Sequence, residues 1–397
     1  MQIRVPQIPI SEIRSSQIAA RQIGPLAGGH VFQPFLVSFN DGVDIYFVEF
    51  FRHGTFLGYN SLSTVRAQNQ DCRAEFQFPS ETTMSRLETR PLQENLGTEV
   101  LNIDLAELDD ETFGLVRQAW QRDPVLLFRR QSLTEEELLA FSKRFGSLDL
   151  DTIKDINTDD PAADDRNSEL FFVSNLHYDD GSKVGGLSND EVVWHTDLIF
   201  RANPASGSIF YGVEMPKGTA KTSFCNMAHA YRTLPDELRR AVDGKRAQCK
   251  YGTEAPLSSF MLQNVDKNFR RETASPEETE AIDQRTPEVV HDMVLENAAT
   301  GERSLYLSPN HTTAIENLSK KDGRELFDAL MDHALRPENI YTHDWRNGDV
   351  LLWDNTRLLH QREAFSGRIP RLAKRTTVYM DPAYFSVPEP AMEDTAT

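Results

Sequence analysis

Residues 192–200 constrain the fold most, because this apolar run is interrupted by two metal-capable side chains, His195 and Asp197. Side chains two residues apart on a β-strand point to the same face of the sheet. If the run is a strand, His195 and Asp197 project together into the interior. They would supply two of the three protein ligands of a metal site. The best-placed third ligand is His360, which ends a second apolar segment far along the chain.

A His-x-Asp pair with a distant histidine binds one face of an octahedral ion and leaves positions open for other ligands. This is the arrangement of non-haem Fe(II) oxygenases. The alternative is structural: His195 would cap a turn, Asp197 would face solvent and His360 would be a hydrogen-bonded core residue. That interpretation also has to account for the spacings described next.

Two further side chains lie at informative distances from the predicted ligands. Arg371 follows His360 by eleven residues, at the start of an apolar strand. A guanidinium there could pair bidentately with a carboxylate, for which arginine is better suited than lysine. Thr222, twenty-five residues after Asp197, could add a hydroxyl to the same anion.

Composition narrows the partners and the compartment. The formal net charge of -19 disfavours nucleic acid and anionic membranes, since binding to either needs a basic footprint. No apolar run is long enough to cross a membrane. The three cysteines form no CxxC spacing, which predicts neither a disulfide framework nor a thiolate zinc cluster, and favours a reducing, cytoplasmic location. Whether the chain forms a homo-oligomer stays open.

A domain boundary is predicted near residue 85. Residues 1–85 are rich in β-pattern, with a hairpin of residues 35–39 and 43–51 around an Asn-Asp-Gly turn. The polar stretch 79–92 begins with a turn signal and suits a linker. We therefore expect a small β-rich N-terminal domain, 1–85, and a second domain, 86–397.

In the second domain, the pattern predicts a mixed α/β but mainly β fold. Many short strands with turn signals favour a double-stranded β-helix, or jelly-roll, core with flanking helices. Two polar stretches, 149–169 and 251–287, are expected to be a mobile loop and a lid. The predicted strands include 97–105, 124–129, 289–295, 349–353 and 372–380, and the predicted helices 110–120, 132–145 and 323–335.

From about residue 86 to 385, the motifs resemble those of the TauD/TfdA dioxygenases: Trp-His-Thr-Asp at 194–197, the turn and strand 217–224, Trp-Asp-Asn-Thr-Arg-Leu-Leu-His at 353–360, and 371–377. The resemblance implies an enzyme that uses Fe(II), 2-oxoglutarate and O2, hydroxylates a small molecule and releases succinate and CO2. His195, Asp197 and His360 would hold iron. Arg371 and Thr222 would bind the distal carboxylate of 2-oxoglutarate.

The resemblance also implies residues for substrate binding. Arg375 matches a position that meets an anionic group of the substrate, with a structural ion pair as the alternative. Asn175 and Asn189 are further candidates for the substrate pocket. The N-terminal segment resembles that of the γ-butyrobetaine and trimethyllysine hydroxylases, but it keeps only Cys72 and His53 of a zinc site, so no zinc is expected.

Two alternatives to this function stay open. A carnitine-type hydroxylase of a quaternary ammonium compound would need an aromatic cage, and the acidic loop would suit such a cation, whereas Arg375 would suit an anion. A non-catalytic jelly-roll protein could retain a metal without turnover. Such a protein has no need for the cosubstrate arginine, Arg371.

Overall fold

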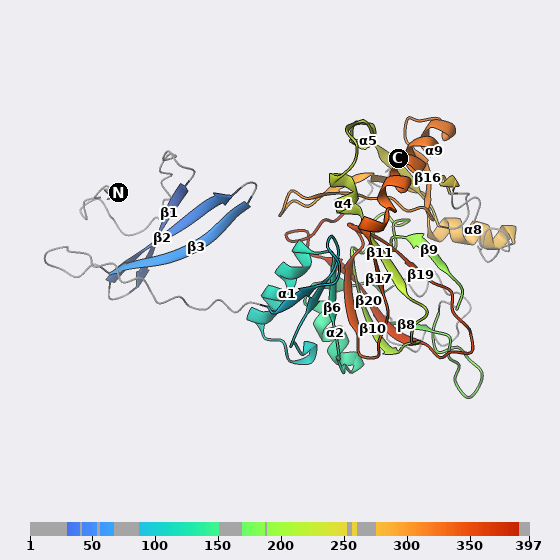
Figure 1. Cartoon of the computed structure of the whole chain (residues 1–397), viewed down its shortest axis with the longest axis horizontal. Helices are drawn as coiled ribbons and strands as arrows, with labels where there is room; N and C mark the ends of the chain where they lie inside the picture. The colour runs from blue at the N-terminus through green and yellow to red at the C-terminus, as the bar shows by residue number, and fades with distance from the viewer. Residues whose placement is uncertain are drawn as a thin grey trace. The chain divides into compact units, whose positions relative to one another are not determined.

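The chain divides into two compact units, residues 1–85 and 86–397. The computed structural model (Figure 1) describes residues 30–39, 42–53, 56–66, 87–150, 169–186, 189–251, 256–259 and 275–388. In the first unit, β1 (His30–Phe39), β2 (Gly42–His53) and β3 (Phe56–Arg66) form an antiparallel sheet. Phe39 pairs with Gly42, so the predicted hairpin is confirmed. Cys72, on which the zinc expectation depends, lies outside the described residues.

The second unit is mainly β and contains two principal sheets (Figure 1). The larger has the order β4 (Thr89–Pro91), β5 (Thr98–Val100), β6 (Val125–Phe128), β18 (Val350–Asp354), β10 (Gly207–Glu214), β20 (Leu372–Met380) and β7 (Gly146–Leu148), and β8 (Phe171–Ser174) also pairs with β20. The smaller has the order β17 (Ile340–His343), β11 (Thr222–Asn226), β19 (Leu358–Arg362) and β9 (Val192–His195). Two minor sheets are β13 (Val289–Asp292), β12 (Arg246–Cys249) and β16 (Thr312–Ile315), and β14 (Val294–Glu296) with β15 (Arg303–Leu305).

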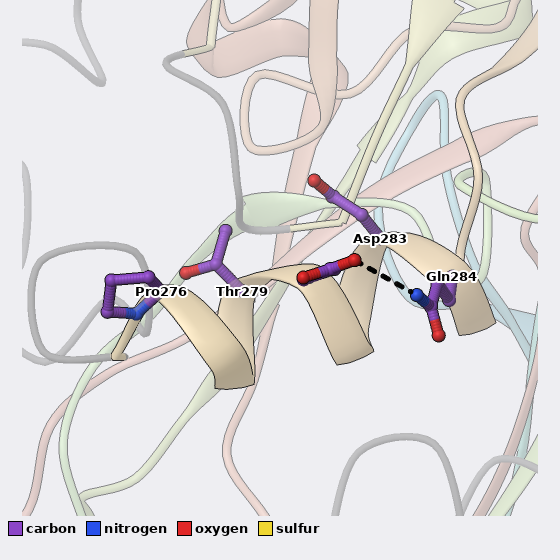
Figure 2. Close-up of a pocket in the computed structure, with 5 residues that line it drawn as sticks. Pro276, Thr279, Asp283 and Gln284 are labelled. Carbon is purple, nitrogen blue, oxygen red and sulfur yellow. Dashed lines mark hydrogen bonds between the residues drawn. The ribbon is translucent and has the colours of Figure 1, made fainter.

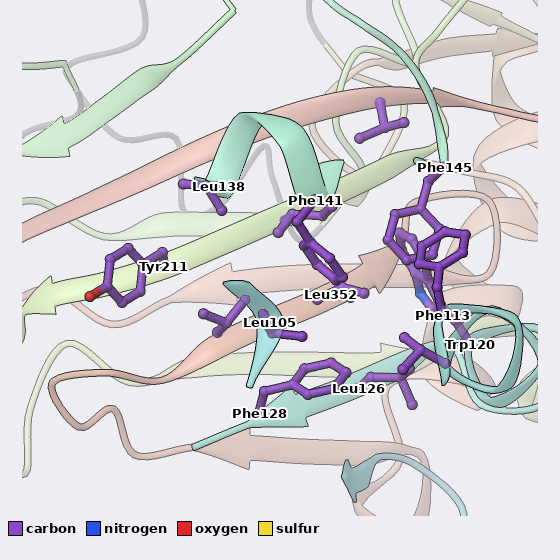
Figure 3. Packing of buried hydrophobic residues seen from close by; sticks show 14 of the residues in the cluster. Leu105, Phe113, Trp120, Leu126, Phe128, Leu138, Phe141, Phe145, Tyr211 and Leu352 are labelled. Carbon is purple, nitrogen blue, oxygen red and sulfur yellow. The ribbon is translucent and has the colours of Figure 1, made fainter. Parts of the chain in front are cut away.

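Strand β6 of the larger sheet is apolar at every position because both of its faces are buried. In β6, Leu126 and Phe128 pack in one hydrophobic cluster, whereas Val125 and Leu127 pack in another on the opposite face. The first cluster (Figure 3) includes side chains of α1 (Asp110–Arg122) and α2 (Glu135–Lys143). The helices therefore cover one face of the sheet and leave the other for the second sheet.

Both helices begin where the capping signals predict. The Asp109 side chain accepts a hydrogen bond from the Thr112 backbone N–H at the start of α1. Thr134 and Glu137 form a reciprocal capping box at the start of α2. The predicted helices 110–120 and 132–145 are thus confirmed, with ends adjusted by a few residues.

The smaller sheet also separates two clusters. Phe224 and Leu358 face the cluster that lies between the two principal sheets. Their neighbours Cys225 and Leu359 point the other way, toward α4 (Met227–Arg232) and α9 (Lys320–Ala334). By this alternation, Thr222 and His360 also face the space between the sheets. The remaining helices with described bounds are α5 (Asp236–Val242) and α8 (Pro276–Arg285).

Some predicted boundaries were wrong. The strand expected over 97–105 is only β5, because Asn102 adopts a positive φ of 55° and a 3-10 helix, Leu105–Glu107, follows. The strand expected over 289–295 is two strands separated at Met293. Most of the expected loop and lid lies outside the described residues. None of the described helices combines the length and apolar character that crossing a bilayer requires.

Candidate active site

Three predicted metal ligands converge at one end of the smaller sheet. His195 is the last residue of β9, and His360, on the adjacent strand β19, lies directly opposite it. Asp197 was expected on the same strand, but it lies in a turn just beyond the strand end. The turn includes Leu198 at a φ of 56°, and the preceding Thr196 donates its hydroxyl proton to the Asn355 carbonyl. A turn, not strand alternation, brings the carboxylate beside the imidazole.

The geometry of these three side chains suits one divalent ion. One ligand atom from each residue lies within 4.8 Å of the other two. His195 Nε2 lies 3.7 Å from Asp197 Oδ1, and His360 Nε2 lies 3.8 Å from Asp197 Oδ2. Two ligand atoms about 2.1 Å from a shared ion can be up to about 4.2 Å apart, so these separations fit.

Protonation also suits metal binding. His195 Nδ1 lies 2.8 Å from the Val193 carbonyl, which can only accept a hydrogen bond, so in the neutral imidazole the proton is on Nδ1 and the lone pair on Nε2. Burial and the neighbouring His195 lower the pKa of His360 to about 3, which keeps that imidazole neutral. Burial alone would raise the pKa of Asp197, but Arg375 and the two imidazoles outweigh burial and hold it well below its usual range.

Asp197 is held by two other side chains. Ser208 Oγ donates to Asp197 Oδ2 over 3.0 Å, and Arg375 Nη1 donates to Asp197 Oδ1 over 3.1 Å. Arg375 was expected to meet the substrate, with an ion pair as the alternative. The structure places it in a buried ion pair with the predicted metal ligand, at the wall of the cavity described next.

A cavity of about 60 Å³ adjoins the ligands between the two principal sheets. Arg371 reaches it with a side chain that is almost fully buried, and its Nε and Nη1 atoms have no hydrogen-bond partner among the residues that the structure describes. A buried guanidinium without a partner fits an anionic ligand. The cavity is lined by Val173, Val192, His195, Phe210, Thr222, Trp345, Trp353, His360, Arg362, Arg371 and Arg375.

Thr222 also lines the cavity, with its hydroxyl already oriented. Trp345 Nε1 donates to Thr222 Oγ1 over 2.8 Å. The threonine oxygen accepts this bond, so the proton of its hydroxyl can be donated elsewhere. Thr222 and Arg371 are thus both hydrogen-bond donors at the cavity, as expected for residues that bind a carboxylate.

The two asparagines predicted for the substrate pocket contact backbone instead, and neither lines the cavity. Asn175 Nδ2 donates to the Ile369 carbonyl over 2.9 Å, and its Oδ1 accepts from the Arg371 backbone N–H over 2.9 Å. Asn189 Nδ2 donates to the Phe365 carbonyl over 3.3 Å. Both asparagines fix the segment that leads into β20, and hence the position of Arg371.

Several residues of the cavity were not predicted from the sequence, among them Arg362 and Trp345. Arg362 lies two residues after His360 on β19, so strand alternation places both on one face. That spacing was visible in the sequence. Trp345 precedes β18 in a loop, and no local pattern links it to Thr222.

A larger hollow of about 560 Å³ follows one side of α8 (Figure 2). Its lining comes from that helix alone, namely Pro276, Thr279, Glu280, Asp283 and Gln284. Gln284 Nε2 donates to Glu280 Oε1 over 3.4 Å, one turn apart. This open helix surface brings no distant residues together, so the smaller cavity at the ligand cluster is the candidate active site.

Comparison with known proteins gives consistent matches. The family model "Taurine catabolism dioxygenase TauD, TfdA family" matches residues 88–377. Pentalenolactone F synthase of Streptomyces avermitilis is 30% identical over 304 residues, which cover 75% of this chain and 95% of that protein. The (S)-phenoxypropionate/alpha-ketoglutarate-dioxygenase of Sphingobium herbicidovorans is 28% identical over 74% of this chain and 95% of its own. The crystal structure of AAD-2 in complex with Mn(II) and N-oxalylglycine is 25% identical, with a TM-score of 0.58 over 78% of this chain and all of that one.

Proposed function

The chain belongs to the TauD, TfdA family of dioxygenases, and from this premise we propose that residues 86–397 form a jelly-roll catalytic domain that oxidises a small molecule. The family resemblance expected from the sequence is confirmed, and with it the class of enzyme and the requirement for Fe(II), 2-oxoglutarate and O2. Hydroxylation with release of succinate and CO2 is the simplest outcome. The cytoplasmic location stays a prediction.

The observation that carries the proposal is the convergence of His195, Asp197 and His360 beside a cavity that contains an unpartnered guanidinium. His360 presents a neutral imidazole, Asp197 an ionised carboxylate, and His195 a second imidazole, so these three would hold iron. Arg371 and Thr222 would bind the distal carboxylate of 2-oxoglutarate. When bound, the iron supplies the activation of dioxygen. The apolar walls of Trp353 and Phe210 limit the access of water.

The charge of the side chains that line the cavity indicates the charge of the substrate. Three guanidinium groups, from Arg362, Arg371 and Arg375, line it; the Asp197 carboxylate pairs with Arg375, and the charge of Asp190 acts on Arg362. Positive walls disfavour a quaternary ammonium compound, which needs an electron-rich aromatic cage. The relatives named for (S)-phenoxypropionate and 2,4-dichlorophenoxyacetate act on organic acids. A small organic acid is therefore the substrate class we favour over the carnitine-type alternative.

The test is an anaerobic titration with Fe(II) and 2-oxoglutarate, followed by the weak visible charge-transfer band of the chelate. We expect the band in the wild-type protein and in Arg368→Ala, which changes an exposed arginine of the neighbouring loop. Absence of the band in the wild-type protein would reject the enzyme and leave a metal-retaining binding protein. If the band is present, succinate release during a screen of small carboxylates, sulfonates and amines would identify the substrate class.

Replacing a metal ligand gives the largest expected loss of activity. His195→Ala or Asp197→Ala should abolish substrate-coupled succinate release, because two protein ligands hold an open site poorly. Gln361→Ala, which changes a half-buried neighbour of His360, is the matched control and should keep activity. Retained coupled turnover in either ligand variant would refute the proposed triad.

A further inference from the structure

Arg362 lies beside Thr222 at the cavity, on the neighbouring strand. In the register of β11 and β19, Thr222 is directly opposite Arg362, and Phe224 is directly opposite His360. Directly opposite residues of an antiparallel pair share a face, with their Cβ atoms about 4.5–5.5 Å apart. The sheet thus presents the Arg362 and Thr222 side chains to the same side as the ligand His360.

Arg371 approaches the same place from the larger sheet. Its Cζ atom lies 5.9 Å from the ring centre of Phe365, and the Cζ atom of Arg362 lies 5.2 Å from the same ring. The two guanidinium groups are close enough to affect each other: burial, and next the charge of Arg362, lower the pKa of Arg371 to about 9. Both arginines are still cationic at neutral pH.

Two buried cations that line one cavity repel each other, and burial has removed most of the water that would screen them. Arg362 and Arg371 are 6% and 2% exposed, and Thr222 is 6% exposed. Arg362 Nη2 donates a hydrogen bond to the backbone carbonyl of Asp190, and the charge of Asp190 offsets only part of the effect of burial on the pKa of Arg362, which falls to about 10. An anion between the two arginines would remove the repulsion and add charge-assisted hydrogen bonds.

We propose that Arg362 is a second arginine for the distal carboxylate of 2-oxoglutarate, which it binds together with Arg371 and Thr222. This inference rests on the proposed function, because it assigns one more residue to the cosubstrate. Arg375 is not part of this group, since its charge is paired with Asp197. The distal carboxylate is thereby held from both principal sheets, with Arg371 next to β20 and Arg362 on β19.

The experiment compares two ligands that differ only in that carboxylate. The dissociation constants of 2-oxoglutarate and 2-oxopentanoate are measured anaerobically with Fe(II) by the charge-transfer band. The constant for 2-oxopentanoate divided by that for 2-oxoglutarate reports what the distal carboxylate contributes. In Arg362→Met, we expect this ratio to fall at least tenfold, mostly through weaker binding of 2-oxoglutarate. Arg368→Met, at an exposed position, should leave the ratio unchanged.

Other outcomes overturn the inference. An unchanged ratio in Arg362→Met would show that Arg362 does not contact the cosubstrate, whether it binds substrate or has no ligand. An equal loss of affinity for both ligands would show a structural role. If Arg362→Met does not fold, Arg362→Lys replaces it; a lysine cannot pair bidentately, so the ratio should fall at least threefold, and an unchanged ratio overturns the inference. Failure of the proposed function is distinct, because the wild-type protein would then show no band with 2-oxoglutarate.

Discussion

Arg357 and Arg371 are almost equally buried, at 1% and 2% exposure, but their surroundings differ. Arg357, between β18 and β19, donates to Asp354 Oδ2 over 2.8 Å and to Glu302 Oε2 over 2.9 Å. It also donates to the carbonyls of Trp120 and Gln121. For Arg371, Nε and Nη1 have no partner in the described structure, and the charge that acts on its guanidinium is that of another arginine, Arg362.

The pKa values of the two guanidinium groups move in opposite directions for this reason. Burial lowers the pKa of both. In Arg357, the carboxylates of Asp354 and Glu302 outweigh burial and raise the pKa above its ordinary value. In Arg371, nothing offsets burial, and the pKa falls to about 9. The charge of the first arginine is neutralised by carboxylates of the fold, whereas the second suits the anionic ligand that we propose.

Stability should separate the two arginines most clearly. Arg357→Met leaves Asp354 as a buried, uncompensated charge and should lower the free energy of unfolding by about 3–5 kcal/mol. Arg371→Met removes a cation that has no counter-ion, so the same quantity should change by less than about 1 kcal/mol or increase. Urea unfolding of both variants without ligands measures the difference. Equal destabilisation would contradict the comparison.

Ligand affinity should show the reverse order. Arg371→Met removes charge-assisted hydrogen bonds to 2-oxoglutarate and should raise its dissociation constant by about 30- to 150-fold, or about 2–3 kcal/mol. Arg357→Lys, chosen to keep the buried charge, should leave the dissociation constant nearly unchanged. The charge-transfer titration gives both values. If binding survives in Arg371→Met at full affinity, the proposed role of Arg371 is wrong.

A smaller loss of Fe(II) affinity is expected when a residue that supports a metal ligand is replaced. Ser208→Ala removes one of the two hydrogen bonds to Asp197, and the Arg375 pair remains. Loss of such a supporting bond typically weakens metal binding about tenfold or somewhat more. Competition with a chelator under anaerobic conditions would measure the affinity for Fe(II). A change as large as that of Asp197→Ala would mean that Ser208 does more than orient the carboxylate.

Much of the fold could be predicted because its signals are local. The capping box of Thr134 and the apolar run of β6 depend on residues within a few positions of each other. Strand β20, Leu372–Met380, has the predicted bounds. Short strands such as β12 and β17 were missed, since four residues carry too little pattern to identify a strand, and packing against neighbouring strands decides them.

The sequence by itself determined the residue types at the site. It identified His195, Asp197 and His360 as candidate metal ligands, and Arg371, eleven residues after His360, as a candidate for binding a carboxylate. Only the tertiary structure decided which charges are paired. It placed Arg375 against Asp197, 178 positions away, and Arg362 opposite Thr222 on an adjacent strand. The physical reason is that helix caps and strand periods are set by near neighbours, whereas the neutralisation of a buried charge depends on whichever distant side chain the fold brings within reach.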